Sequence, residues 1–192
     1  MKKLFVTLLI ATVSVCAFAQ KGQMAIGANL SYTPCLEKGA DLSNFGVSAK
    51  FQYNFTDALR GELNAGYDFK DKGVSFLTAA ANFHYLFNLG EKFKIYPIVG
   101  VGFAHISFDY SGWAEDVIDD AYGDYLDDEL QDLIDEAYKD AGSDSENKLL
   151  VNAGLGAEYD LSDNFSLCAE VKYQYIKDCC RLPISIGFAY KF

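Results

Sequence analysis

A histidine and a serine lie two positions apart in Phe103-Ala-His-Ile-Ser107, where a strand would place both side chains on one face. Together they could supply the base and the nucleophile of an esterase. The chain has only two histidines, no Cys-x-x-Cys, no Gly-x-Ser-x-Gly and no phosphate-binding glycine loop. We therefore predict no enzyme activity, no cofactor and no metal site, with an esterase at His105 and Ser107 as the alternative.

Eight charged residues could form an internal network of ion pairs. Four are basic and four are acidic, and all fall on the polar faces of predicted strands. An eight-stranded barrel is only wide enough for side chains to fill it, and charges in such an interior must be paired. We predict a lumen plugged by charged side chains, with an ion pathway as the alternative. The residues are Lys50, Arg60, Glu62, Asp68, Glu158, Glu170, Lys172 and Lys191.

Three cysteines are predicted to lie in two loops that barrel closure brings together. Cys35 follows the first predicted strand, whereas Cys179 and Cys180 follow the seventh. The first and eighth strands become neighbours when a barrel closes, and an exported protein can form disulfides. The candidate bridge joins Cys35 to Cys179 or Cys180, and free thiols are the alternative.

One segment carries all of the excess negative charge. The chain has a net charge of −11, and residues 113–147 alone contain 14 acidic residues and one basic residue. Apolar residues recur there at three- and four-residue steps, which predicts an amphipathic helix in an acidic extracellular loop. The loop has no EF-hand spacing, and the acidic balance disfavours nucleic acid. A basic partner or cation-bridged lipopolysaccharide could bind it, and an acidic lid is the alternative. The candidate residues are Asp119, Asp120, Asp127, Asp128, Glu129, Asp135 and Glu136.

Alternating segments must position these groups. Residues 182–192 place six apolar side chains on one face, and a strand of this length can cross a bilayer when tilted. Its edge cannot stay unpaired in hydrocarbon, so a barrel must close. Seven earlier segments alternate similarly, which makes eight strands. In the fifth segment, the apolar residues change from one alternating set of positions to the other near Ala104, which predicts a β-bulge. The seven segments are residues 24–32, 45–55, 59–69, 77–87, 93–110, 151–159 and 165–175.

The predicted connections alternate in length. Those after the second, fourth and sixth strands are tight, whereas residues 33–44 and 111–147 form the two longest loops on the other side. Aromatic residues gather near both ends of the strands, as in the interfacial girdles of membrane barrels. This arrangement predicts an outer-membrane barrel with its loops outside and both termini in the periplasm.

The amino terminus predicts export. Lys2 and Lys3 precede an apolar run, and Ala17-Phe18-Ala19 suits a signal peptidase. Residues 1–19 are therefore a predicted cleaved signal peptide, and residues 20–192 are the barrel domain. Acylation of Cys16 is the alternative, although the residues before it lack the usual lipoprotein pattern.

On these features the chain resembles the small OmpA/OmpX-like outer-membrane β-barrels of the porin family. The resemblance covers the mature chain and includes the terminal Phe192. It implies an all-β, eight-stranded, antiparallel, up-and-down transmembrane barrel in the cell outer membrane. The implied partners are lipid, lipopolysaccharide and the assembly machinery that recognises the C-terminal strand. The implied protein is a monomer with a structural or surface-interaction role, and a narrow low-conductance porin is the alternative. A lipocalin-like barrel would instead turn its apolar faces inward.

His105 and Ser107 also resemble the His-x-Ser of outer-membrane lipid A deacylases. That family continues with asparagine and has an acidic partner on the next strand, whereas here Phe108 follows. The predicted position of Glu158 is near the opposite rim, roughly 25 Å away at about 3.3 Å per residue. The match is partial, and a lipid A-modifying esterase is kept as an alternative function.

Overall fold

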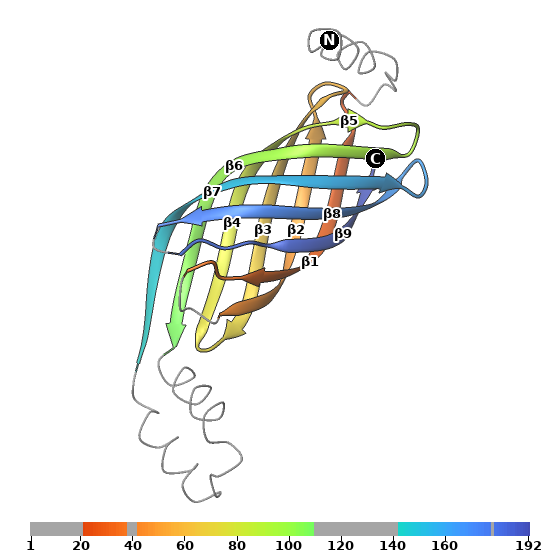
Figure 1. Cartoon of the computed structure of the whole chain (residues 1–192). Coiled ribbons are helices and arrows are strands. Elements are labelled where there is room, and N and C mark those ends of the chain that lie inside the picture. Colours follow the sequence, from red (N-terminus) through yellow and green to blue (C-terminus); the bar gives the residue numbers. More distant parts are fainter. Residues whose placement is uncertain (1–20, 38–41, 110–141, 178) are drawn as a thin grey trace, which may run out of the picture.

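The computed structural model describes residues 21–37, 42–109, 142–177 and 179–192. Within them, eight antiparallel strands form a closed barrel, which confirms the predicted fold (Figure 1). β4 and β5 are two parts of one strand, because both pair with β6 on either side of Leu86. The strands are β1 (Met24–Pro34), β2 (Ser43–Asn54), β3 (Leu59–Asp71), β4 (Val74–Tyr85), β5 (Phe87–Asn88), β6 (Phe93–Asp109), β7 (Ser143–Asp160), β8 (Phe165–Ile176) and β9 (Ile184–Lys191).

The barrel closes between β1 and β9, as predicted. Their pairing runs from Ala25↔Lys191 to Tyr32↔Ile184. Met24 and Phe192 then exchange backbone hydrogen bonds of 3.2 and 2.9 Å. We call the end of the barrel that contains this pair the terminal rim. The opposite end, where β6 ends and β7 begins, is the loop rim.

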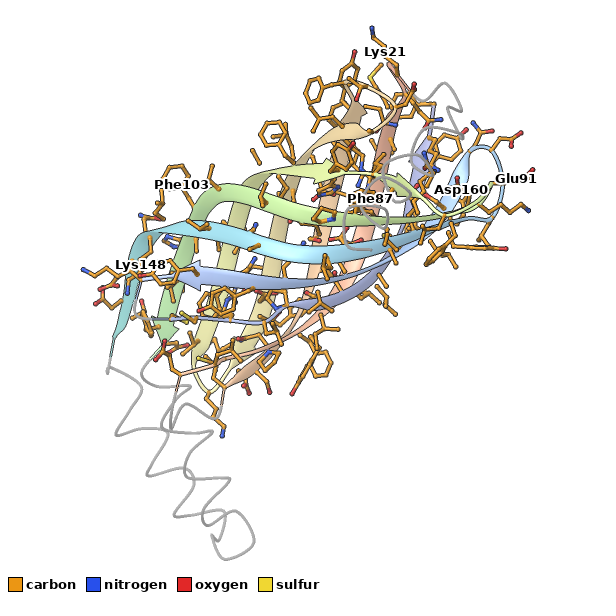
Figure 2. All side chains as sticks on the ribbon, turned by 45° about the horizontal axis from the view of Figure 1, so that its top comes forward. Lys21, Phe87, Glu91, Phe103, Lys148 and Asp160 are labelled. Carbon is orange, nitrogen blue, oxygen red and sulfur yellow. The ribbon has the colours of Figure 1, made fainter. Side chains whose placement is uncertain are left out.

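The barrel is apolar outside and polar inside. Along β8, Ser166, Glu170 and Lys172 are buried in the lumen, whereas Leu167 and Val171 between them are exposed. The period of two in a strand produces this division. Figure 2 shows the large side chains, such as that of Phe103, projecting away from the wall. An apolar surface around a charged interior suits lipid rather than water.

Among the described residues, no helix is both long enough and apolar enough to cross a bilayer.

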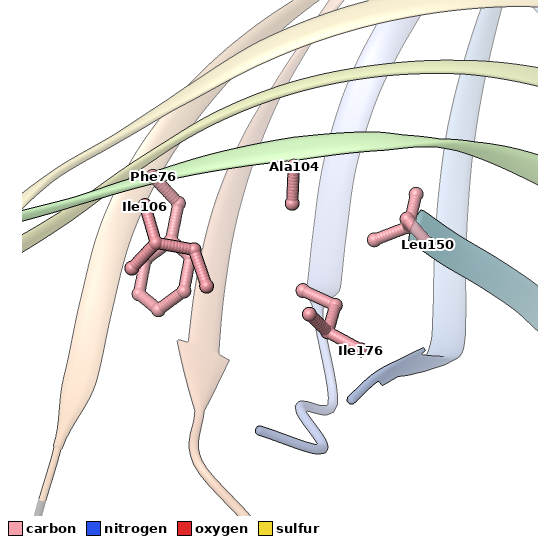
Figure 3. Packing of buried hydrophobic residues seen from close by; sticks show 5 residues of the cluster. All are labelled: Phe76, Ala104, Ile106, Leu150 and Ile176. Carbon is pink, nitrogen blue, oxygen red and sulfur yellow. The ribbon is translucent and has the colours of Figure 1, made fainter. Parts of the chain in front are cut away.

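The β-bulge predicted near Ala104 is wrong. β6 keeps an unbroken register with both β4 and β7 through this region. Ala104 and Ile106 instead point into the lumen, where they pack with side chains from β4, β7 and β8 (Figure 3). The alternation of apolar residues along β6 shifts because the lumen itself becomes apolar near the loop rim. We call this group the apolar layer; it consists of Phe76, Ala104, Ile106, Leu150 and Ile176.

Strands β3, β4 and β7 extend further toward the loop rim than predicted. β3 and β4 are joined by Lys72 and Gly73, whose φ angles of 46° and 73° suit a tight two-residue hairpin. β7 begins at Ser143, so residues 143–147 of the acidic segment belong to a strand. Residues 143–149 pair with β6 but extend past the pairing of β7 with β8, which begins at Leu150. The predicted signal peptide and helix lie outside the described residues.

Candidate functional site

Near the terminal rim, three cations surround two carboxylates inside the barrel. Glu158 accepts a 2.6 Å hydrogen bond from Arg60 and lies 2.9 Å from the Lys191 ammonium. Lys94 lies 3.5 Å from Glu158 and 2.7 Å from Asp160, which also pairs with Lys191. These side chains come from β3, β6, β7 and β9, so the cluster connects opposite walls of the barrel.

A second cluster at mid-height is centred on Glu170. Its carboxylate lies 3.4 Å from the Lys50 ammonium and 3.1 Å from the Lys172 ammonium. It also accepts a 3.0 Å hydrogen bond from the Tyr96 hydroxyl. Lys50 has a second contact, 2.8 Å from the Cys168 sulfur. All five side chains are buried, so both lysines are held by internal partners.

Glu62 is held mainly by amides. Gln52 and Asn82 donate hydrogen bonds of 2.8 and 3.0 Å to its carboxylate. The His84 ring is 3.9 Å away and stacks on Tyr96 with centroids 4.8 Å apart. Sequence periodicity placed Glu62 correctly in the lumen, but it could not show which side chains would bind it.

Asp68 pairs with Arg181, which was absent from the predicted network. The Arg181 guanidinium donates 2.8 Å hydrogen bonds to Asp68 and to Gln174. Its carbon also lies 3.8 Å from the ring centre of Phe76. Arg181 therefore joins the ionic lumen to the apolar layer. It was missed because it precedes β9, in a connection that sequence reasoning treated as a loop.

Lys94 and Asp160 were also missed. The inward face of β6 begins with Lys94, Tyr96 and Ile98, but the apparent shift in the alternation near Ala104 hid this face. The signal that could have found Lys94 is the alternation with Val99 and Val101, which continues backwards to the start of β6. Asp160 is the last residue of β7 and lies one position past the predicted segment 151–159. All eight predicted network residues lie in the lumen and are buried.

Two small cavities lie among the lumenal side chains, and a wider pocket of about 470 Å³ opens at the terminal rim beside Lys94, Asp160 and Lys191. A cavity of about 30 Å³ is lined by Asp68, Lys172 and neighbouring polar side chains. A second cavity, of about 10 Å³, lies against Arg60, Glu158 and Lys191. About 10 to 15 Å³ of such volume is needed to hold one water molecule, so the two cavities have room for a few waters at most. Neither cavity could hold a hydrated ion.

The His105 ring does not pair with a carboxylate. Its Nδ1 lies 2.9 Å from the Asn147 side-chain oxygen, and Asn147 is its register partner on β7. Ser107 faces Ser145 in the same ladder. Glu158 lies inside the barrel and binds Arg60. On this face of β6 the geometry thus supplies a histidine and a serine, and the acid that follows them on the strand, Asp109, binds Lys70.

The candidate disulfide residues lie near one another at the loop rim. Cys35 pairs with Arg181, and the Leu36 amide donates a 2.8 Å hydrogen bond to the Cys180 carbonyl. The four described cysteines are free thiols in this structure. Burial and the neighbouring Cys35 raise the pKa of the Cys179 thiol to about 11.

The acidic surface candidates lie outside the described residues. This applies to all seven of them, Asp119, Asp120, Asp127, Asp128, Glu129, Asp135 and Glu136. The part of the acidic segment that is described, residues 143–147, extends β7 past the loop rim.

Comparison with family models determines which class of barrel this is. Residues 5–192 match the model described as the outer membrane protein beta-barrel domain. The chain belongs to this family. It is therefore an outer-membrane β-barrel protein, as the apolar outer surface and closed sheet independently indicate. A comparison with curated protein sequences finds no significant match.

Solved structures support the same fold at low sequence identity. Neisserial surface protein A matches with a TM-score of 0.66 and 14% identity, covering 90% of this chain and 100% of that one. Ail, the attachment invasion locus protein of Yersinia pestis, matches with a TM-score of 0.60 and 16% identity, covering 90% and 99%. Its complex with the heparin analogue sucrose octasulfate matches with a TM-score of 0.59 and 17% identity, covering 90% of this chain and 99% of that one. At these identities the likeness shows the fold alone.

Proposed function

We propose that this outer-membrane barrel has a structural or surface-interaction role and that its lumen is closed to solutes. The observation that carries the proposal is the small size of the two cavities that lie among the lumenal side chains, about 30 Å³ and 10 Å³. Between them, charged side chains bind one another across the barrel. An ion would have to displace these internal partners while losing its own water, which is costly in a low-dielectric interior.

The apolar layer supports the same proposal. Phe76, Ile106 and Ile176 are each at most 1% exposed, and Arg181 covers the face of Phe76 that points toward the charges. An apolar constriction opposes ion passage because it excludes water. The lumen thus has two successive barriers, one ionic and one apolar.

Planar-bilayer recording of the purified barrel tests the closed lumen. We expect no stable conductance of nanosiemens size from the natural chain. A double variant, Phe76→Ala with Arg181→Ala, removes both sides of the contact below the loop rim and should produce more frequent small openings. A reproducible nanosiemens channel from the natural chain would refute the proposal, and a small regular conductance would favour the narrow porin.

The proposed surface role rests on the acidic segment. Outer-membrane barrels place their short turns in the periplasm and their long loops outside, so the loop rim should face the cell surface. Residues 113–147 carry 14 acidic residues and one basic residue. We propose that they bind a basic partner or cation-bridged lipopolysaccharide. The Yersinia Ail protein was solved with a polyanionic heparin analogue; the charge of this chain favours the opposite kind of ligand.

Deletion of residues 113–140 tests this role. The deletion spares Ser143–Glu146, because these residues are paired in β7. The barrel should still fold, whereas binding of a polylysine probe and its dependence on salt should disappear. A control deletion of 38–40 in the first loop should leave binding intact. If the 113–140 deletion binds polylysine as well as the full chain does, the segment is only a lid.

We propose no enzymatic role. The ring nitrogen of His105 binds the amide of Asn147, and Glu158 is held in the lumen by Arg60. Overexpression should therefore leave the mass spectrum of lipid A unchanged. Deacylated lipid A that disappears in a Ser107→Ala variant would instead establish the esterase.

A further inference from the structure

The closure between β1 and β9 continues past the last paired residues of these strands at the loop rim. Cys35 forms an isolated antiparallel bridge with Arg181, and Arg181 forms another with Gln174 of β8. The Leu36 amide donates to the Cys180 carbonyl at 2.8 Å, and the Leu182 amide donates to Pro34 at 3.0 Å. The chain segments that carry the cysteines are therefore held side by side by their backbones.

The two adjacent cysteines in this region have different surroundings. The Cys179 thiol lies close to that of Cys35, which contributes to the raised pKa of Cys179. Cys179 also packs against the apolar layer from outside it. The Cys180 side chain instead lies beside Tyr173, whose side chain is on the outer face of β8. Cys168 is remote from this group, because it lies in the lumen against Lys50.

We propose that Cys35 and Cys179 form a disulfide that locks the closure of the barrel at the loop rim, and that Cys180 stays a thiol. The structure shows the reduced form of this site. The proposal rests on the closeness of the two thiols and on the backbone pairing that holds their chain segments side by side. It does not depend on whether the lumen conducts or the acidic segment binds a partner.

The co-reactant is a disulfide, of the class supplied by small-molecule disulfides and thiol–disulfide oxidoreductases in exported compartments. The Cys35 thiolate attacks one sulfur of that disulfide and releases the first thiolate. The Cys179 thiolate then attacks the Cys35 sulfur and releases the second. The two protons lost by the cysteines end on the two released thiolates. One disulfide is reduced to two thiols while one is formed in the barrel.

The bridge would constrain a very large loop. Nearly the whole barrel lies between Cys35 and Cys179, and a cross-link that closes a long loop restricts the unfolded chain strongly. It would also fix one side of the apolar layer, because Cys179 packs against that layer. Oxidation would therefore stabilise both the closure and the apolar barrier.

Peptide mapping of the folded, detergent-purified barrel tests the pairing. The protein is incubated with oxidised glutathione, and its free thiols are alkylated before proteolysis and mass spectrometry. We expect a peptide linked through Cys35 and Cys179, with Cys180 alkylated. The oxidised barrel should also unfold at a higher urea concentration than the same sample after reduction.

Two single variants separate this pairing from its neighbours. Cys180→Ser should keep both the linked peptide and the redox-dependent shift in the urea midpoint. Cys179→Ser should lose both and leave Cys35 bound to glutathione. A bridge between Cys35 and Cys180 as the main product, or three unbridged cysteines in the natural chain, would overturn the proposal.

Discussion

Glu158 illustrates how single residues determine this interior. It lies within 3.5 Å of Arg60, Lys94 and Lys191, and its side chain is 2% exposed. Because water is nearly excluded, Arg60 depends on this carboxylate for its compensation, whereas Lys94 and Lys191 also bind Asp160. The stability of this end of the barrel should therefore respond more to charge than to volume.

Glu158→Gln should destabilise the barrel strongly, because it keeps the shape and removes the charge that faces three cations. Breaking a buried ion pair costs about 3 to 5 kcal/mol, and we expect a loss of this size. The matched control is Asp109→Asn, which weakens the exposed pair with Lys70 and should cost less than about 1 kcal/mol. Urea unfolding in lipid vesicles measures both. Equal losses in the two variants would contradict this account of the lumen.

The Cys179 thiol should react slowly below pH 10. Its pKa is raised to about 11, and only the thiolate is nucleophilic. Raising the pKa of an acid favours its neutral form, so at pH 8 about one thiol in a thousand is ionised. The alkylation rate by iodoacetamide should rise about tenfold per pH unit up to about pH 11. Mapped peptides from the reduced barrel give this rate, and a plateau near pH 9 would contradict the shift.

At the scale of elements, β6 shows what sequence could and could not predict. The alternation of Val99, Val101 and Phe103 correctly gave a membrane-facing strand. Beyond it, the predicted β-bulge near Ala104 would have put Ile106 on the outer face, because the prediction assumed that every inward position is polar. Alternation identifies two faces but not their environments, and only the packing against Phe76 shows that part of the lumen is apolar.

The partners inside the lumen were harder to predict than the faces. All eight predicted network residues are buried there, but Arg181 and Lys94 were missed and Glu62 binds amides. Strand periodicity fixes which way a side chain points. The pairings across the barrel depend on the stagger and tilt of distant strands, which a single sequence does not reveal.

Gly156→Ala should disturb β7 and β6 together. A Cβ at this position would lie 2.2 Å from the Tyr96 ring, which is buried between Arg60 and Glu170. Forcing extra volume into a packed interior costs about 1 to 3 kcal/mol. Gly66→Ala is the control, since its nearest neighbours are at 3.1 Å. The urea midpoint should fall clearly in the first variant and little in the second; the reverse order would argue against a tightly packed Tyr96.

The whole molecule should behave as a monomeric, heat-modifiable outer-membrane barrel. Every strand has two neighbours in a closed sheet, so the folded form should resist detergent and migrate differently from the boiled chain. Fractionation should recover the protein in the outer membrane. A Phe192→Ala variant should reduce that yield if assembly machinery recognises the terminal strand. A purified chain whose gel mobility is unaffected by boiling would contradict the barrel.

The pairing of β1 with β9 has a consequence for the order of folding. All the other pairs of neighbouring strands are consecutive in the chain, whereas Ala25 and Lys191 belong to its two ends. Contacts between distant residues form slowly, because chain entropy opposes them until the rest of the structure is present. The sheet should therefore grow hairpin by hairpin, and its two outermost strands should meet last. Until they meet, each of these strands presents an edge of unpaired backbone N–H and C=O groups, with which another chain could pair. The lifetime of that open intermediate therefore sets the tendency to aggregate.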